Sequence, residues 1–226
     1  QTHQLSRLVM GDTATVQQII NQLKHDDCQV RTGAMAQLTT IAASLGPERT
    51  CEELLPFIRD CVDDEDDVLE VLAAQIGCLA EFIGGNSQVH ILLPNIEVLL
   101  GAEQSKVREK AVESCKQIAL IMSPEQINEH FYPLLVRLRD AVWYTPKISL
   151  AVLISNIYPH ISDEKKTELR AFYKEVSCST VPLVRRAGSA NLAAFIRVIE
   201  NEYVDSFIIP LLKEATSDDQ DYVRFM

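Results

Sequence analysis

The sequence contains no apolar run that approaches the roughly 18 residues needed to cross a membrane. Its first residues, QTHQLSRLVM, lack the long apolar core of a signal peptide. Glycine and proline are scarce, with 8 and 9 among 226 residues, which argues against a loop-rich β protein. We therefore expect a globular chain with no membrane partner.

Positive charge is also in short supply. The chain has 21 lysine and arginine residues against 32 aspartate and glutamate residues, a net charge of −11. Binding to a phosphate backbone requires clustered cations, so we expect no nucleic-acid partner. An acidic surface is compatible with protein partners that carry basic surfaces.

Disulfide and glycosylation signals are missing as well. The six cysteines never form a Cys-x-x-Cys pair, and no Asn-x-Ser/Thr sequon occurs. In a chain of this length the pattern favours reduced cysteines that act as small hydrophobic residues. We expect a cytoplasmic protein, with the nucleus as the other compartment open to it.

Catalytic and metal-binding motifs are absent too. The five histidines share no ligand spacing, and the sequence has no HExxH, P-loop, GxSxG or GxGxxG. The run Asp63 to Asp67 has enough carboxylates to bind a calcium ion. Calcium-binding loops, however, space their ligands alternately and include a glycine, and this run has neither feature. We interpret this run as a solvated turn that also touches a partner. The sequence predicts no catalytic residue, metal or cofactor, and the chain is not expected to be an enzyme.

What the sequence does contain is an internal repeat. A valine, replaced once by proline, follows a polar turn at Val30, Val68, Val107, Pro146, Val184 and Val223. The spacings are 38, 39, 39, 38 and 39 residues. A basic residue follows five of these six anchors, namely Arg31, Arg108, Lys147, Arg185 and Arg224. Self-similarity at a period of this length is typical of stacked repeat proteins.

Each period has the pattern of two helices. Apolar residues recur 4, 8, 11 and 15 positions after the anchor, which is the spacing of one helical face. The helix before the turn carries a proline at Pro56, Pro94, Pro133 and Pro210, and Ala171 takes that place in the fifth period. A proline inside a helix usually kinks it. Leu45-Gly46-Pro47 predicts a helix end, and Ser123-Pro124-Glu125-Gln126 predicts a capping box.

Helix pairs of this kind bury their apolar faces only when they stack. The sequence therefore predicts an all-α fold, an α-solenoid of about five full helix pairs plus a truncated sixth. We place the repeats at about 13–46, 47–85, 86–122, 123–161, 162–200 and 201–226 of one solenoid domain. Because the sixth repeat stops soon after Val223, we expect the chain to be the N-terminal part of a longer protein.

The basic residues behind the anchors admit two interpretations. They form a ladder of ion pairs to acids in neighbouring turns, or they form a basic binding stripe. We favour the ladder, with Arg185 and Arg186 as the expected exceptions. Exposed pairs contribute only about 0–1 kcal/mol each, so the stacking energy is expected in the apolar columns.

Repeats of this length built as helix pairs resemble HEAT repeats, whose solenoids wind as right-handed superhelices. The segments LLPFIRDCVDDEDDVLEVLAAQIG, KVREKAVES, WYTPKISL and PLVRRAGSANLAAF, in this order and spacing, resemble the scaffolding A subunits of protein phosphatase 2A. The resemblance covers about 13–224. It implies a non-catalytic scaffold whose N-terminal turns hold the regulatory B subunits. The catalytic subunit would bind C-terminal repeats that this chain does not include.

The resemblance also implies protein-binding residues in the turns. These are Asp64, Glu65, Asp66, Asp67, Glu103, Trp143, Tyr144, Pro182, Arg185 and Arg186. Gln104, Ser179 and Thr180 stand where the family has acids, which puts the electrostatic contacts there in doubt. Trp143 is the only tryptophan, and it either anchors a partner or packs over the corner of its own repeat.

Two other functions fit a helical solenoid. A karyopherin-type transport receptor would bind basic cargo, but armadillo-type receptors of that class repeat tryptophan and asparagine along their inner helices. A DNA glycosylase on a HEAT scaffold would need a basic groove, and the sequence pI of about 4.9 speaks against one. The scaffold therefore remains the favoured interpretation.

Overall fold

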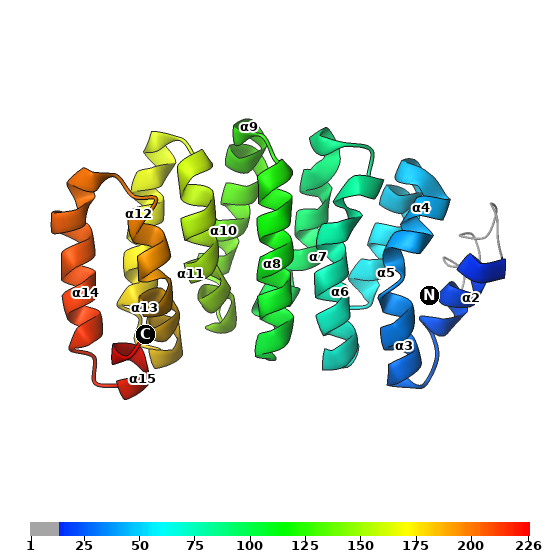
Figure 1. Cartoon of the computed structure of the whole chain (residues 1–226), viewed down its shortest axis with the longest axis horizontal. Helices are drawn as coiled ribbons and strands as arrows, with labels where there is room; N and C mark the ends of the chain where they lie inside the picture. Colours follow the sequence, from blue (N-terminus) through cyan, green and yellow to red (C-terminus); the bar gives the residue numbers. More distant parts are fainter. Residues whose placement is uncertain (1–13) are drawn as a thin grey trace. The chain divides into compact units, whose positions relative to one another are not determined.

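The computed structural model describes residues 14–226, and every regular element in this part of the chain is a helix (Figure 1). The described part of the chain divides into two compact units, 14–122 and 123–226. The all-α repeat solenoid is thereby confirmed as the fold class. The repeat boundaries and the superhelical hand stay predictions, and Thr13 lies outside the described residues.

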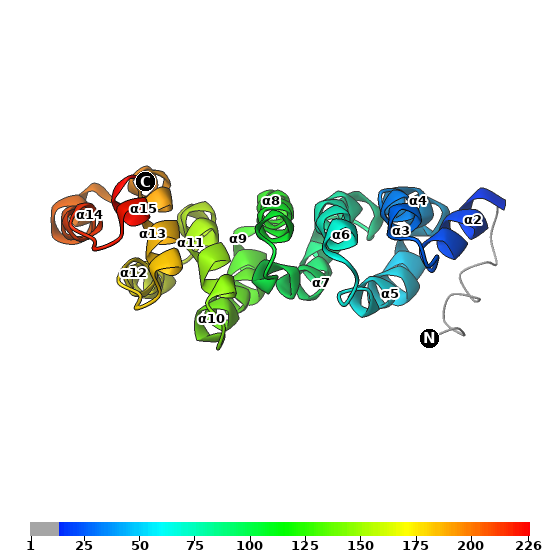
Figure 2. The same cartoon turned by 90° about the horizontal axis from the view of Figure 1, so that it is seen from below.

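The first unit is built from helix pairs in two rows, with α5 and α7 in one row and α3, α6 and α8 in the other (Figure 2). Its elements are α2 (Ala14–Gln22), α3 (Cys28–Met35), α4 (Leu38–Arg49), η1 (Thr50–Leu54), α5 (Leu55–Asp60), α6 (Asp66–Cys78), η2 (Leu79–Phe82), η3 (Asn86–Leu92), α7 (Leu93–Glu97), η4 (Leu99–Gly101) and α8 (Ser105–Ile121).

The second unit continues the same alternation of helices before and after a turn. Its elements are α9 (Pro124–Gln126), η5 (Ile127–Phe131), α10 (Tyr132–Asp140), α11 (Thr145–Ile157), η6 (Tyr158–His160), α12 (Asp163–Ser177), α13 (Pro182–Ile196), η7 (Asn201–Tyr203), η8 (Val204–Ile208), α14 (Ile209–Thr216) and α15 (Asp221–Arg224).

The apolar columns seen in the sequence form the core of each unit. The positions eleven residues after the anchors are completely buried at Ile41, Leu79, Ile118, Ile157 and Phe195. In the second unit the ring of Phe195 stacks on Tyr173 with centroids 4.2 Å apart and meets Tyr158 edge-on at 5.2 Å. A large buried side chain stabilises the fold by about 1.5–3 kcal/mol, so these columns dominate the stability.

The helix boundaries follow the signals in the sequence. Gly46 has φ of 76°, in the left-handed region, and breaks α4 before Pro47. At the start of α9, the Gln126 amide N–H donates to Ser123 Oγ at 3.3 Å. The Ser123 amide N–H donates to Gln126 Oε1 at 3.0 Å. The expected helix end and capping box are therefore both confirmed.

The recurring proline widens its helix into a π turn. Pro56, Pro133 and Pro210 each follow a π-helical segment, where the residue before proline donates its N–H to the carbonyl five residues back. Proline has no N–H for the carbonyl four residues back, and the wider turn accommodates that gap. Pro94 follows the 3₁₀ segment η3 instead. In α12 alanine replaces the proline at Ala171, and the α-helix is continuous.

Close packing of α6 on α8 yields the first testable prediction. A Cβ atom at Gly77 would lie 3.1 Å from the Ser114 Cα and 2.9 Å from its Oγ. Since α8 backbone would have to move, we expect Gly77→Ala to destabilise the chain by about 1–3 kcal/mol. Gly33→Ala is the control, because Gly33 meets no atom within 4 Å and alanine favours helix by about 1 kcal/mol. Urea unfolding of both variants measures the difference, and equal midpoints would contradict the close packing.

Candidate protein-binding surface

The turns between paired helices gather at one end of the helices in each unit. In the first unit they are 23–27, 61–65 and 102–104, and in the second they are 141–144, 178–181 and 217–220. Figure 1 shows the turns of each unit along its lower edge. We call these turns, with the first turn of the helix after each, the turn surface of that unit.

A recurring arginine ties four of the six turns to the helix that follows each of them. Its Nη1 donates to main-chain carbonyls six and five residues earlier. The pairs are Arg31 to His25 and Asp26, Arg108 to Ala102 and Glu103, Arg185 to Ser179 and Thr180, and Arg224 to the Asp218 carbonyl. The cation thus satisfies carbonyls that follow a helix end, where positive charge is favourable. This bonding of the arginines to turn carbonyls was not predicted from the sequence. The signal that could have indicated it is the constant position of the arginine directly after the anchor residue.

Two of these arginines also reach the next turn. Arg31 Nη2 lies 2.9 Å from Asp64 Oδ1 and 3.1 Å from Glu65 Oε1. Arg185 Nε lies 2.6 Å from Asp218 Oδ2, and its Nη2 lies 2.7 Å from Asp219 Oδ1. Both arginines use acids 33 and 34 residues ahead, so the ladder is confirmed at these two positions. Thr180 and Val181 hold the equivalent places for Lys147 and offer no acid.

The expectation that Arg185 is an exception to the ladder is wrong. Its side chain is only 16 % exposed and Asp218 only 7 %, so the pair lies inside the unit and not on a free surface. Asp64 is likewise only 18 % exposed beside Arg31. The partner contacts of both residues stay predictions, but their first role is to join neighbouring repeats.

The acidic residues that follow Asp64 are exposed, whereas Asp64 itself is largely buried. Asp66 and Asp67 are exposed in the first turn of α6, where the helix dipole favours negative charge. Glu65 is exposed too, although it pairs with Arg31. Glu103 is exposed in the next turn. The structure therefore leaves these four residues accessible to a partner.

The fourth turn is the most apolar part of the second-unit turn surface. Trp143 is 75 % exposed and Val142 95 % exposed, and Tyr144 beside them is also exposed. Trp143 therefore does not pack over the corner of its own repeat. A cluster of this kind at the edge of a helical unit is typical of a protein-binding site.

The next two turns of the second unit add exposed apolar side chains that were not predicted from the sequence. Leu183 and Tyr222 each stand directly before an anchor valine, and Phe225 follows the last one. Large apolar residues at polar turns were the signal that could have found them. Arg186 is exposed beside Leu183, and Pro182 is half-buried at the start of α13.

The ion pair of Arg185 predicts a pH dependence of stability. The guanidinium of Arg185 holds the pKa of the Asp218 carboxyl well below its usual range. A lowered pKa in the folded state stabilises the fold above the unfolded value, about 3.9, and this contribution is lost as the pH falls further. We therefore expect wild type to lose more stability between pH 5 and pH 2 than Asp218→Asn. Unfolding curves at both pH values test this, and identical pH slopes would contradict it.

The described residues include no cluster of metal ligands, no membrane-spanning helix and no disulfide. Across 14–226 no three His, Cys, Asp or Glu side chains gather as a metal site would require. Nor does this part of the chain hold a helix long and apolar enough to cross a bilayer. The six cysteines, which all lie in that range, are free thiols.

The fold and the turn surface together define a repeat-solenoid protein of stacked helix pairs. Its backbone resembles the crystal structure of Cex1p, with a TM-score of 0.60, over 93 % of this chain and 39 % of that one. Sequence identity is only 14 %, so this likeness shows the fold alone. No family model matches the chain.

Curated relatives show the family. The chain is 38 % identical over 219 residues to a relative from Schizosaccharomyces pombe that is named as the regulatory A subunit of protein phosphatase PP2A, covering 96 % of this chain and 37 % of the relative. It is 42 % identical over 194 residues to the protein phosphatase 2A scaffold subunit of Dictyostelium discoideum, covering 85 % and 33 %. The chain belongs to the family of protein phosphatase 2A regulatory A, or scaffold, subunits.

These relatives also bear on the expectations about function. The chain spans about a third of the length of the curated relatives it matches. Both are named as regulatory or scaffold subunits, which agrees with the expectation that the chain is not an enzyme. Neither is named as a transport receptor, so the karyopherin alternative finds no support in them.

Proposed function

We propose that the chain is part of a non-catalytic scaffold of a protein phosphatase 2A holoenzyme and that it holds regulatory B subunits on its turn surfaces. The observation that carries this proposal is the exposed cluster of Val142, Trp143 and Tyr144 in a turn of a family member. Exposed aromatic residues are the usual anchors of protein interfaces. The chain as a whole has a net charge of −11, and its acidic turn at 63–67 suits a partner with basic patches.

The catalytic subunit belongs to a different part of the proposed scaffold. The family resemblance assigns it to C-terminal repeats, and this chain covers only about a third of the length of its relatives. We therefore propose that this chain by itself binds a B subunit weakly and does not bind the catalytic subunit. The cytoplasm, with the nucleus as second compartment, is the proposed location.

Titration calorimetry of the whole chain against purified B and catalytic subunits, each in a separate experiment, tests the proposal. We expect a heat of binding in the titration with the B subunit and none in the titration with the catalytic subunit. Raised salt should weaken that binding through the charged turns but leave the aromatic contribution. Tight binding of the catalytic subunit, or no binding of any B subunit, would overturn the assignment. A pull-down from cell extract that brings down Ran with basic cargo would favour the transport receptor instead.

A further inference from the structure

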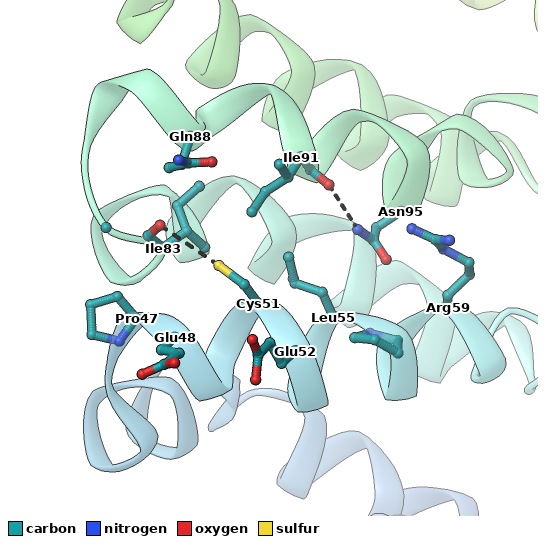
Figure 3. Close-up of a pocket in the computed structure, with 12 residues that line it drawn as sticks. Pro47, Glu48, Cys51, Glu52, Leu55, Arg59, Ile83, Gln88, Ile91 and Asn95 are labelled. Carbon is teal, nitrogen blue, oxygen red and sulfur yellow. Dashed lines mark hydrogen bonds between the residues drawn. The ribbon is translucent and has the colours of Figure 1, made fainter.

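A groove in the first unit has no part in the turn surface. It runs between the helix that leads to Pro56 and the helix that leads to Pro94, and its volume is about 550 Å³ (Figure 3). Leu55, Ile83 and Ile91 line it with apolar side chains. The groove therefore has both the size and the apolar walls of a ligand site.

A buried polar side chain in the wall of this groove lacks a partner. Asn95 is only 1 % exposed, and its Nδ2 donates to the Ile91 carbonyl at 3.2 Å. Because that carbonyl can only accept, the amide orientation is fixed and Oδ1 is left without a hydrogen-bond donor. Figure 3 shows this oxygen directed toward the helix of Leu55 across the groove. A buried acceptor without a donor costs about 1–3 kcal/mol, so a ligand N–H is the natural complement.

The two ends of the groove carry opposite charges. Glu48 and Glu52 line one end, and Arg59 lines the other, beside Asn95 (Figure 3). All three are exposed, and no ion pair among the described residues engages them. A ligand that fits must therefore place a cation near the glutamates and an acceptor or anion near Arg59.

We propose that this groove binds an extended peptide segment. A main-chain N–H of the peptide donates to Asn95 Oδ1, an acidic side chain pairs with Arg59, and a basic side chain pairs with Glu48 and Glu52. An apolar side chain between them packs on Leu55 and Ile91.

The dimensions of helix and peptide agree with this arrangement. Seven residues separate Glu52 from Arg59 and eleven separate Glu48 from Arg59, or about 10 and 16 Å along a helix. In an extended peptide, residues four apart lie about 13 Å apart and point to the same face. The expected ligand therefore has a basic residue, an apolar residue two positions on and an acid four positions on.

The probe is the peptide acetyl-KSLSE-amide, whose blocked ends leave only the two side-chain charges. It is titrated into the isotope-labelled whole chain and followed by NMR. The Asn95 side-chain amide and the methyl groups of Leu55 and Ile91 should shift in a dose-dependent way. The peptide acetyl-SKLES-amide has the same composition but the wrong charge spacing, and it should bind about tenfold more weakly.

Variants separate binding from folding. Asn95→Leu removes the buried acceptor, so the unfolding midpoint should stay or rise while peptide affinity falls about tenfold. Glu52→Gln and Arg59→Gln should each weaken binding, and Glu81→Gln, an exposed acid outside the groove, should not. The double variant Glu52→Lys with Arg59→Glu should prefer acetyl-ESLSK-amide.

Three results would overturn the proposal. They are no shift at the groove residues up to millimolar peptide, equal binding of the two peptides of the same composition, and unchanged affinity in folded Asn95→Leu. None of them bears on B-subunit binding by the turn surface, so this inference and the proposed function fail independently.

Discussion

Replacing Arg185 by glutamate is expected to destabilise the second unit by about 3 kcal/mol or more. The substitution leaves Asp218 without its cation in a largely buried site and brings a second carboxylate beside it. It also removes the hydrogen bonds from Arg185 to the carbonyls of Ser179 and Thr180. Chemical unfolding of wild type and variant measures the loss, and a transition at lower denaturant concentration is the expected result.

The adjacent arginine provides the matched control. Arg186 is exposed, and no ion pair among the described residues engages it, so Arg186→Glu should change the stability by no more than about 0.5 kcal/mol. A double-mutant cycle with Asp218→Asn then isolates the pair, because Arg185 and Asp218 act as a unit. Equal stabilities for the two arginine variants would show that the ladder does not join these repeats.

The burial of Arg185 against Asp218 determines how the Arg185→Glu phenotype should be interpreted. The family resemblance makes Arg185 a partner contact, but its burial in the ladder makes it a structural residue first. We expect the variant to lose B-subunit binding in proportion to the unfolding of 178–224. Arg186→Glu, by contrast, should weaken binding in a folded chain if this turn contacts an acidic patch.

Trp143→Ala is expected to weaken B-subunit binding about 30-fold while leaving the unfolding midpoint unchanged. A central aromatic anchor typically contributes about 2 kcal/mol or more to an interface. The stability should not change because three quarters of the side chain is exposed in the free chain, at 75 %. Titration calorimetry and thermal unfolding of the same preparation measure the two effects.

Leu120→Ala is the control for this experiment. Leu120 is 83 % exposed, but it lies near the C-terminal end of α8, whereas the turn surface of its unit includes only the first turn of α8. Its loss should alter neither binding nor stability. If folded Trp143→Ala bound with wild-type affinity to the B subunit, the fourth turn would not be part of the interface. If both variants weakened binding alike, the effect would not be specific to the turn surface.

The sequence by itself determined the fold class and the register of the repeats. A helix repeats its facing positions every three or four residues, so the buried columns that include Ile41 and Ile118 can be read directly from the spacing. Helix ends such as Gly46 and Ser123 were equally legible, because backbone conformation and capping are local properties. Relatedness to the phosphatase scaffolds was also legible in the sequence, because the similarity extends over 219 residues of the chain.

The tertiary structure decided which charges are free. Arg185 and Arg186 are neighbours in sequence, yet one is buried against Asp218 and the other is exposed. The π turn before Pro133 and the unpartnered Asn95 oxygen were also invisible in the sequence. Ion pairing and burial depend on residues more than 30 positions away, brought close only when the helix pairs stack. A periodic pattern fixes which face of a helix is buried, but it does not fix which side chains meet across the next repeat.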